Sequence, residues 1–250
     1  MSGRRKKRIL NKLYFIAQMK KLITITTLAL LVVSALVSQT GCTDEKLTTV
    51  IVDIDWVNFI KFNDITYLRK VTTTDFFQEE DLVYFDKVRF KLADNVNQPS
   101  YGSKNGDAAY LEEGTPIYSI KGYSPDFRLI ANTGTKILLY EADTNPHAEK
   151  GADLLDIGGK VEYIDINGSG GKTNLASIKE ESLVSSLVEM VLNAPVDQTF
   201  RSSGGSQLFI VFHLTDGTVV KRSFWPDDGE LSRGIMVPEE FVKTIKSNVP

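Results

Sequence analysis

The only cysteine of the 250-residue chain, Cys42, ends a segment whose composition suits covalent attachment of lipid to a thiol. Met19-Lys20-Lys21 supplies a positive start, the apolar run from Leu22 to Val37 follows, and the small residue Gly41 directly precedes the cysteine. This order is typical of a bacterial export signal that is cut before an acylated cysteine. We therefore expect residues 19–41 to be a signal peptide and Cys42 to become the lipid-modified first residue of the mature chain.

The sequence also suggests roles for the residues before and after this signal, and one alternative for the signal itself. The apolar run is short for a membrane span, which needs about 20 residues, so an uncleaved signal anchor that extends to Gly41 is the less favoured alternative. Residues 1–18 place a basic cluster before a signal that is already complete, and we expect them to come from an over-long gene start. An extended signal or a nucleic-acid-binding arm are the other interpretations of these residues. Residues 42–46 would form a short lipidated tether.

The charge of the chain limits its partners. Removing residues 1–41, which hold eight of the 29 Lys and Arg residues and none of the 32 Asp and Glu residues, changes the formal net charge from −3 to −11. An acidic body of this kind disfavours nucleic acid and a purely electrostatic attachment to anionic lipid. We expect attachment through the lipid on Cys42, at the outer face of the cytoplasmic membrane, and no nucleic-acid partner.

A glycine-rich segment from Asn167 to Thr173 resembles a phosphate-binding loop, because it follows a predicted strand and ends in Gly-Lys-Thr. Such a loop needs a further glycine five residues before its Gly-Lys pair, where backbone N–H groups wrap a phosphate. Ile166 occupies that position. We therefore interpret residues 167–173 as a flexible linker between two domains.

Oxygen-bearing side chains gather in one loop that could hold calcium. The candidates are Asp143, Asn145, Asp153 and Asp156. The spacing lacks the alternating ligands, central glycine and final glutamate of a calcium loop, so a solvated acidic loop is the favoured interpretation. We predict neither a metal site nor a cofactor.

The remaining groups that could do catalysis lack a recognisable pattern. His147 lies in a polar loop, His213 lies in a predicted strand, and no Gly-x-Ser-x-Gly or His-Glu-x-x-His sequence occurs. Ser202, Ser203 and Ser206 belong to a glycine-rich turn and are interpreted as structural. No catalytic residue is predicted, although two carboxylates that the fold brings together could still act on a polymer.

The elements that would position these residues are mostly strands up to residue 166. Segments with alternating apolar residues recur between turn residues, which predicts a barrel or sandwich over residues 47–166. One of them slips at Asp86-Lys87, where a β-bulge would restore the alternation. The aromatic residues of this region are expected to build its core. The predicted strands are 48–56, 82–92, 116–121, 127–131, 136–141 and 160–166.

Residues 174–250 are expected to form a smaller α+β domain, so the whole chain is assigned to the α+β class. Apolar residues at three- and four-residue spacing from Leu183 to Leu192 predict a helix, with Ser177 and Glu180 as its capping box. Residues 208–214 and 218–225 would pair as a hairpin around Asp216-Gly217. Pro238 would open a last helix, which completes a helix–hairpin–helix order.

Three segments carry a resemblance to a known group of proteins. They are Leu111–Tyr118, Gly122–Arg128 and Phe212–Thr218. With the signal that ends at Cys42, they resemble uncharacterised lipoproteins of Gram-positive bacteria, although those signals prefer an apolar residue where this chain has Gln39. The resemblance implies a surface lipoprotein and no known active site. We expect non-enzymatic binding of a protein or cell-envelope component, with a solute-binding component or a carboxylate-dependent hydrolase of wall polymer as the alternatives.

Overall fold

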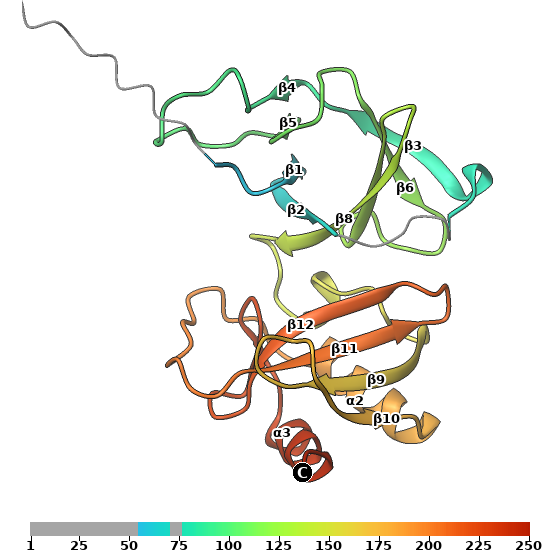
Figure 1. Cartoon of the computed structure of the whole chain (residues 1–250), viewed down its shortest axis with the longest axis vertical. Coiled ribbons are helices and arrows are strands. Elements are labelled where there is room, and N and C mark those ends of the chain that lie inside the picture. The colour runs from blue at the N-terminus through green and yellow to red at the C-terminus, as the bar shows by residue number, and fades with distance from the viewer. Residues whose placement is uncertain (1–54, 71–76) are drawn as a thin grey trace, which may run out of the picture. The chain divides into compact units, whose positions relative to one another are not determined.

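Strands dominate the part of the chain that the structure describes (Figure 1). The computed structural model describes residues 55–70 and 77–250. The expected gene start, the expected signal peptide, Cys42 and the expected tether lie outside the described residues, as does most of the first predicted strand. The described residues form an eight-stranded sheet and a six-stranded sheet with two α-helices, and the prediction of a β-rich chain is confirmed.

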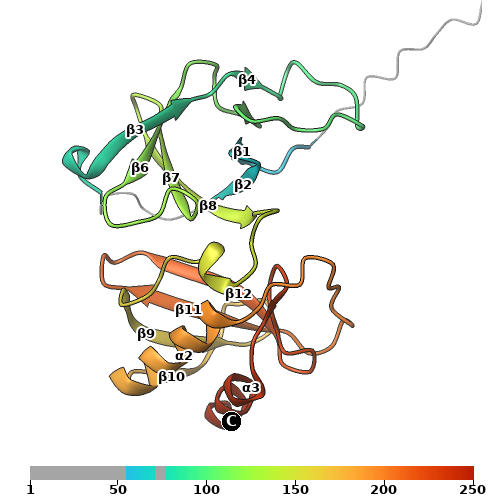
Figure 2. The same cartoon turned by 180° about the vertical axis from the view of Figure 1, so that it is seen from behind.

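The first sheet is so strongly curled that its two edge strands, β3 and β4, follow each other directly in the chain (Figures 1 and 2). Its strand order is β3-β6-β7-β8-β2-β1-β5-β4, and only residues 88–89 separate β3 from β4. The pairing of β3 with β6 shifts between Tyr84 and Asp86, so the predicted bulge is present, one residue earlier than expected. The strands are β1 (Phe59–Phe62), β2 (Ile65–Arg69), β3 (Leu82–Lys87), β4 (Phe90–Lys91), β5 (Asp107–Ala108), β6 (Pro116–Ile120), β7 (Arg128–Asn132) and β8 (Ile137–Thr144).

The curl of this sheet encloses a core that is partly aromatic. Phe62 and Tyr67 are buried there with aliphatic residues such as Ile60 and Leu129. Tyr84 is an exception, because 61% of its surface is exposed. Burial alternates along β2, as a period-two pattern predicts, whereas four consecutive residues of β7, Arg128 to Ala131, are all buried.

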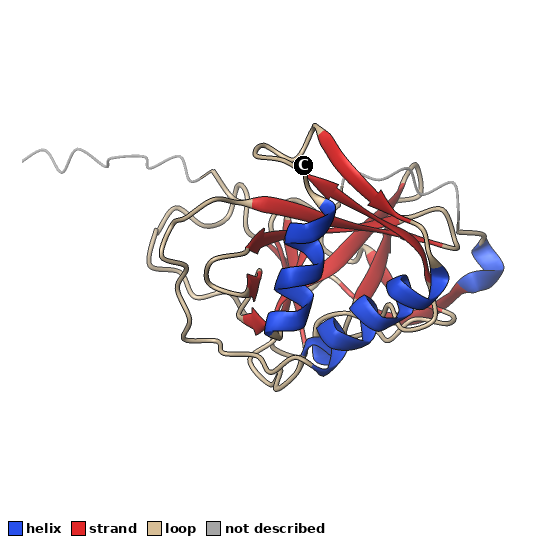
Figure 3. Cartoon of the chain, turned by 90° about the horizontal axis from the view of Figure 1, so that it is seen from below, coloured by secondary structure: helices blue, strands red, loops and turns tan. Residues whose placement is uncertain are grey.

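The second sheet is antiparallel and carries both helices on one face (Figure 3). Its order is β10-β9-β11-β12-β13-β14. Leu187 of α2 and Phe241 of α3 are fully buried in one core with Ile164 and Phe212 of the sheet. The elements are β9 (Val161–Asn167), β10 (Asn174–Ile178), α2 (Glu181–Asn193), β11 (Leu208–Leu214), β12 (Val219–Trp225), β13 (Glu230–Leu231), β14 (Ile235–Met236) and α3 (Glu239–Asn248).

The helix–hairpin–helix description of the C-terminal part is too simple. The hairpin of β11 and β12 forms as predicted, with a positive φ at Gly217, but it lies inside a sheet of six strands. The predicted capping box is wrong, because Ser177 lies in β10 and its hydroxyl donates to Asp165 at 2.6 Å. Glu180 instead occupies the N-cap position of α2.

The structure also differs from the expected domain boundary. Asn167 ends β9, and residues 168–173 join it to β10, its hydrogen-bonded neighbour in the same sheet. Positive φ angles at Gly170 and Gly171 suit the turn of a hairpin, which explains the glycine-rich sequence. The chain passes from the first sheet to the second between Thr144 and Val161, because Ile164 and Ile166 of β9 face the core that contains α2.

Candidate functional site

A buried ion pair lies on β7 and β8 of the first sheet. Arg128 and Glu141 are cross-strand partners, and neither side chain is exposed to solvent. Arg128 donates to Glu141 Oε1 from Nη2 at 2.6 Å and from Nε at 3.1 Å. Two buried charges of this kind are costly to desolvate, so they persist only where further partners satisfy their remaining hydrogen-bonding atoms.

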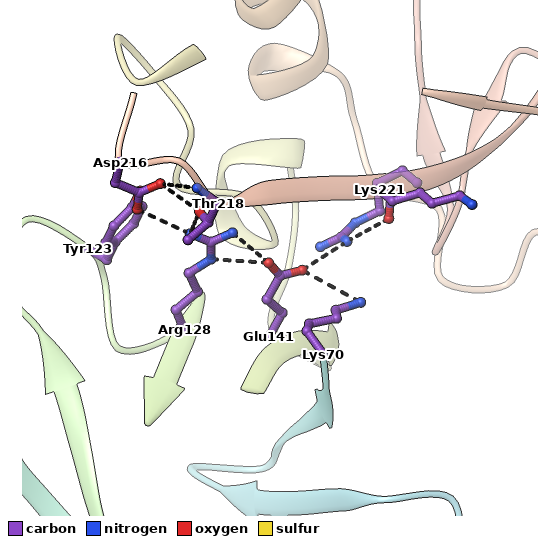
Figure 4. Close-up of polar contacts among 8 residues, drawn as sticks. Lys70, Tyr123, Arg128, Glu141, Asp216, Thr218 and Lys221 are labelled. Atoms are coloured by element: carbon purple, nitrogen blue, oxygen red, sulfur yellow. Dashed lines mark hydrogen bonds and ion pairs between the residues drawn. The ribbon is translucent and has the colours of Figure 1, made fainter. Parts of the chain in front are cut away.

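The turn between β11 and β12 supplies those partners on one side (Figure 4). Arg128 Nη1 donates to Thr218 Oγ1 at 2.8 Å, and the Thr218 hydroxyl donates to Asp216 Oδ1 at 2.7 Å. The Tyr123 hydroxyl donates to Asp216 Oδ2 at 2.6 Å. The Arg128 guanidinium also lies 5.0 and 4.8 Å from the ring centroids of Tyr123 and Phe127, within the range of cation–π attraction. Each side-chain nitrogen of Arg128 therefore has a hydrogen-bond partner.

The other side of the pair carries more positive than negative charge. Glu141 Oε2 lies 3.4 Å from Arg222 Nη1 and 3.6 Å from Lys70 Nζ, so one carboxylate faces three cations. Burial acts to raise the pKa of Glu141, but Arg128, Arg222 and Lys70 outweigh it and hold that pKa below its usual value. Burial lowers the pKa of Lys70, and the nearby Arg222 lowers it further.

A cavity of about 700 Å³ opens beside this network. The residues that line it come from the end of β8, from residues 196–202, from β12 and from the β13–β14 hairpin, so both sheets contribute to its walls. Polar groups dominate the lining, and Trp225 is among its few large apolar side chains. Its charged lining residues are Lys70, Arg201, Lys221, Arg222, Arg233, Asp143, Asp197 and Glu230.

The four candidate calcium ligands have other roles. Asp143 binds Arg233 at 2.6 Å, and the Asn145 amide donates to the Asp153 carbonyl at 3.2 Å. Asp153 accepts from backbone N–H groups, and Asp156 accepts from Lys160 at 2.5 Å. Within residues 55–70 and 77–250, no group of three or more His, Cys, Asp and Glu side chains could hold a metal ion.

The histidines and serines also have defined places. His213 Nε2 lies 2.9 Å from Asp165, the ring stacks on Tyr163, and Ser177 binds the other oxygen of Asp165. The carboxylate is therefore the central group, whereas nucleophilic catalysis needs the histidine between serine and carboxylate. His147 is an exposed loop residue.

The serines of the glycine-rich turn bind one carboxylate. Ser202 and Ser203 each donate a hydroxyl hydrogen bond of 2.7 Å to Asp228, and Ser206 is exposed. This arrangement lowers the pKa of Asp228, so the carboxylate accepts hydrogen bonds in its charged form. The structural interpretation of this turn agrees with these contacts.

Arg128, Glu141, Arg222 and Lys70 were not singled out by the sequence patterns. A sequence signal for the first two exists, because the turn at residues 133–136 places Arg128 opposite Glu141 once the flanking strands pair. An arginine directly before the apolar run of Leu129 to Ala131 also indicates a buried partner. Arg222 and Lys70 come from distant segments, which a local pattern cannot connect.

In comparisons with known proteins, no family model, curated protein or solved structure matches this chain. In the part of the chain that the structure describes, no helix has the length and apolar character needed to cross a membrane.

Replacing Gly234 with alanine should damage the wall of the cavity. A Cβ atom at Gly234 would lie 2.0 Å from the Asp197 carbonyl oxygen, and its φ of +78° is strained for alanine. We expect a loss of about 2–4 kcal/mol in the free energy of unfolding, measured with denaturant. Gly134→Ala is the matched control, because Gly134 has a φ of +79° and open space, and should cost only about 1 kcal/mol. Equal losses for the two variants would contradict this account.

The network should make stability depend on pH in acid. The folded-state pKa values of Glu141 and Asp216 lie below their usual values of 4.5 and 3.8, so the folded state binds fewer protons than the unfolded state. The stabilisation is complete above those usual values and is lost as the pH falls through the folded-state values. We expect denaturant-measured stability to fall from about pH 4.5 downward, and less steeply in Glu141→Gln. Asp86→Asn, at an exposed ion pair, should keep the wild-type slope; a Glu141→Gln slope equal to the wild type would contradict the assignment.

Proposed function

We propose that this chain is a lipid-anchored protein on the outer face of the cytoplasmic membrane that binds a protein or cell-envelope component without catalysis. The lipid signal that ends at Cys42 and the acidic composition of the mature chain support the location. In this proposal the curled first sheet is a barrel-like domain, and the six-stranded sheet with α2 and α3 is the smaller α+β domain. The bound component occupies the cavity between them.

The cavity is the observation that carries this proposal. Small-molecule sites in proteins are concave, have volumes of roughly 300–1,000 Å³ and contain a few convergent polar groups, and a cavity of about 700 Å³ fits this description. The buried network holds Arg222 and Lys70 at its wall through Glu141. Charged groups that are fixed before binding reduce the ordering cost of association.

Acid–base hydrolysis of a wall polymer has less support. A carboxyl group that acts as a general acid near neutral pH needs a raised pKa. Among the described residues, each carboxyl group with a resolved shift has a lowered pKa, and Asp197 at the cavity is one of them. We therefore keep binding as the proposed activity.

A solute-binding component is the second candidate, because the volume of the cavity suits a small molecule. The two candidates differ in what they hold, a free solute or a group on a larger envelope component. Size-separated ligand fractions distinguish them.

The proposal is tested by thermal unfolding of the purified mature chain with cell-envelope extract, divided into a small-molecule and a macromolecular fraction. A ligand that binds only the folded state raises the melting temperature. We expect the macromolecular fraction to raise it and Arg201→Gln, at the cavity, to reduce the rise; Lys243→Gln, an exposed charge-matched change on α3, should not. A shift with the small-molecule fraction alone would favour the solute-binding candidate. No shift with either fraction would contradict both.

A further inference from the structure

The cavity beside the ion network has more positive charge than its own carboxylates neutralise. Five of its lining residues are Lys or Arg, and three are Asp or Glu. Asp143 is already paired with Arg233 at 2.6 Å, and Asp197 accepts the N–H and hydroxyl of Thr199. Glu230 accepts the Gly234 N–H at 3.0 Å. Each of the three acidic residues of the cavity therefore already has a hydrogen-bond or ion-pair partner. The five cations of the lining outnumber these carboxylates.

Arg222 is the least satisfied of these cations. Only 8% of its side chain is exposed. Its Nη1 donates to the Lys221 carbonyl at 3.1 Å and shares Glu141 Oε2 with Lys70 at a long 3.4 Å. Its Nη2 is buried and has no hydrogen-bond partner among residues 55–70 and 77–250. A buried N–H of a charged group is costly to leave without an acceptor, so an acceptor from outside the described residues would relieve this cost.

Lys70 and Arg201 extend the same positive region. The Lys70 side chain is 30% exposed, and its nearest carboxylate oxygen is the one it shares with Arg222, at 3.6 Å. Arg201 donates from Nη1 to the backbone carbonyls of Gln198 and Phe200, at 3.2 and 2.6 Å. Both residues line the cavity. A negative group in the cavity would offset the repulsion by which Arg222 lowers the pKa of Lys70.

We propose that the cavity binds an oxyanion, a carboxylate or a phosphate, through Arg222 and Lys70, with Arg201 at its rim. The inference rests on the proposed function and names the chemical class of the bound group. Guanidinium groups match the planar or tetrahedral arrangement of such oxygens and bind them with charge-assisted hydrogen bonds. The oxyanion can belong to a free solute or to a phosphodiester or peptide chain, and the chemistry of recognition is the same.

The fluorescence of Trp225 offers a direct test, because Trp225 lines the cavity and the chain has one other tryptophan, Trp56. In a Trp56→Phe background, the mature chain is titrated with sodium phosphate and sodium acetate against sodium chloride at equal ionic strength. We expect a saturable change with at least one oxyanion and none with chloride. Calorimetry with the same salts provides a second readout.

Matched variants separate specific binding from general attraction. Lys70→Gln and Arg222→Gln should each weaken binding at least tenfold, and Lys243→Gln, which removes the same charge from exposed α3, should change it less than twofold. Because Arg222→Gln can unfold the chain, circular dichroism accompanies each titration. If Arg222→Gln does not fold, the result for Lys70→Gln, whose side chain is more exposed, tests the proposal on its own. Equal binding by Lys70→Gln and Lys243→Gln would overturn the proposal.

The source of the oxyanion is tested with a soluble glycerol-phosphate polymer and its monomer. Tighter binding of the polymer supports recognition of a group on an envelope chain, and equal binding supports a free solute; both retain the oxyanion site. No saturable binding of phosphate, acetate or the polymer would overturn the oxyanion site. That failure would leave the proposed function standing if the envelope extract still raised the melting temperature.

Discussion

Glu141→Ala should lower the free energy of unfolding by about 3–5 kcal/mol, because the buried Arg128 guanidinium loses its close carboxylate at 2.6 Å and keeps only the longer ion pair with Asp216 at 3.7 Å. Whole domains have stabilities of about 5–15 kcal/mol, so this one change would remove a large share. The same variant also deprives Arg222 of a carboxylate at 3.4 Å. Chemical denaturation, followed by tryptophan fluorescence and circular dichroism, measures the loss.

Asp86→Ala provides the matched control. Asp86 binds Arg89 at 2.6 Å, the same distance as in the buried pair, but the two side chains are 27% and 55% exposed. Exposed ion pairs contribute about 0–1 kcal/mol, since water screens both charges. In a double-mutant cycle, Arg128→Ala together with Glu141→Ala should cost clearly less than the sum of the single changes. A loss for Glu141→Ala no larger than that for Asp86→Ala would refute the structural role of the network.

Cys42→Ala should abolish incorporation of labelled palmitate into the protein. The sequence places the only thiol of the chain directly after the expected signal peptide, so no other cysteine could replace it. Two acyl chains at about 0.8 kcal/mol per buried CH₂ group hold a protein stably at a membrane, and an acidic body contributes no electrostatic attraction. The measurement is labelling in growing cells, followed by mass spectrometry of the mature N-terminus.

The neighbouring change Thr43→Ala should keep the label, and Gln39→Leu should increase the processed fraction, since it restores the apolar residue that such signals prefer. We expect the wild-type mass to begin at a lipid-modified Cys42. A free thiol on a chain that retains residues 19–41 would show instead that the signal remains as an uncleaved anchor.

Local patterns predicted the elements of the fold better than their arrangement. Alternation and turn residues are properties of neighbouring residues, and they placed β6, β7, β8 and the β11–β12 hairpin close to where they lie. Local patterns cannot assign β9 to one of the two sheets, because that assignment depends on a distant partner strand. The partner is β11, which lies more than 40 residues later in the chain. A glycine-rich turn between β9 and β10 and a linker between domains have the same composition, so the sequence of residues 167–173 does not distinguish them.

The candidate site was harder to predict for a related reason. Residues that titrate or bind metal draw attention when they cluster in sequence, as Asp143 to Asp156 do, but those side chains bind Arg233, Lys160 and backbone groups. The groups at the cavity come from β8, β12 and the segment after β2, and only the packing of the two sheets brings them together. Arg128 opposite Glu141 is the exception, since the register of one hairpin suffices to pair them.

Photo-crosslinking in intact cells tests most directly the claim that the cavity is the binding site. A photo-reactive phenylalanine at Ser232, which lines the cavity, is compared with the same residue at Tyr84, which is 61% exposed on β3 and does not line it. The account predicts one discrete envelope adduct from position 232, absent from position 84 and reduced when Lys70→Gln is added. The same adducts from both positions, or an adduct at 232 that Lys70→Gln leaves unchanged, would contradict it.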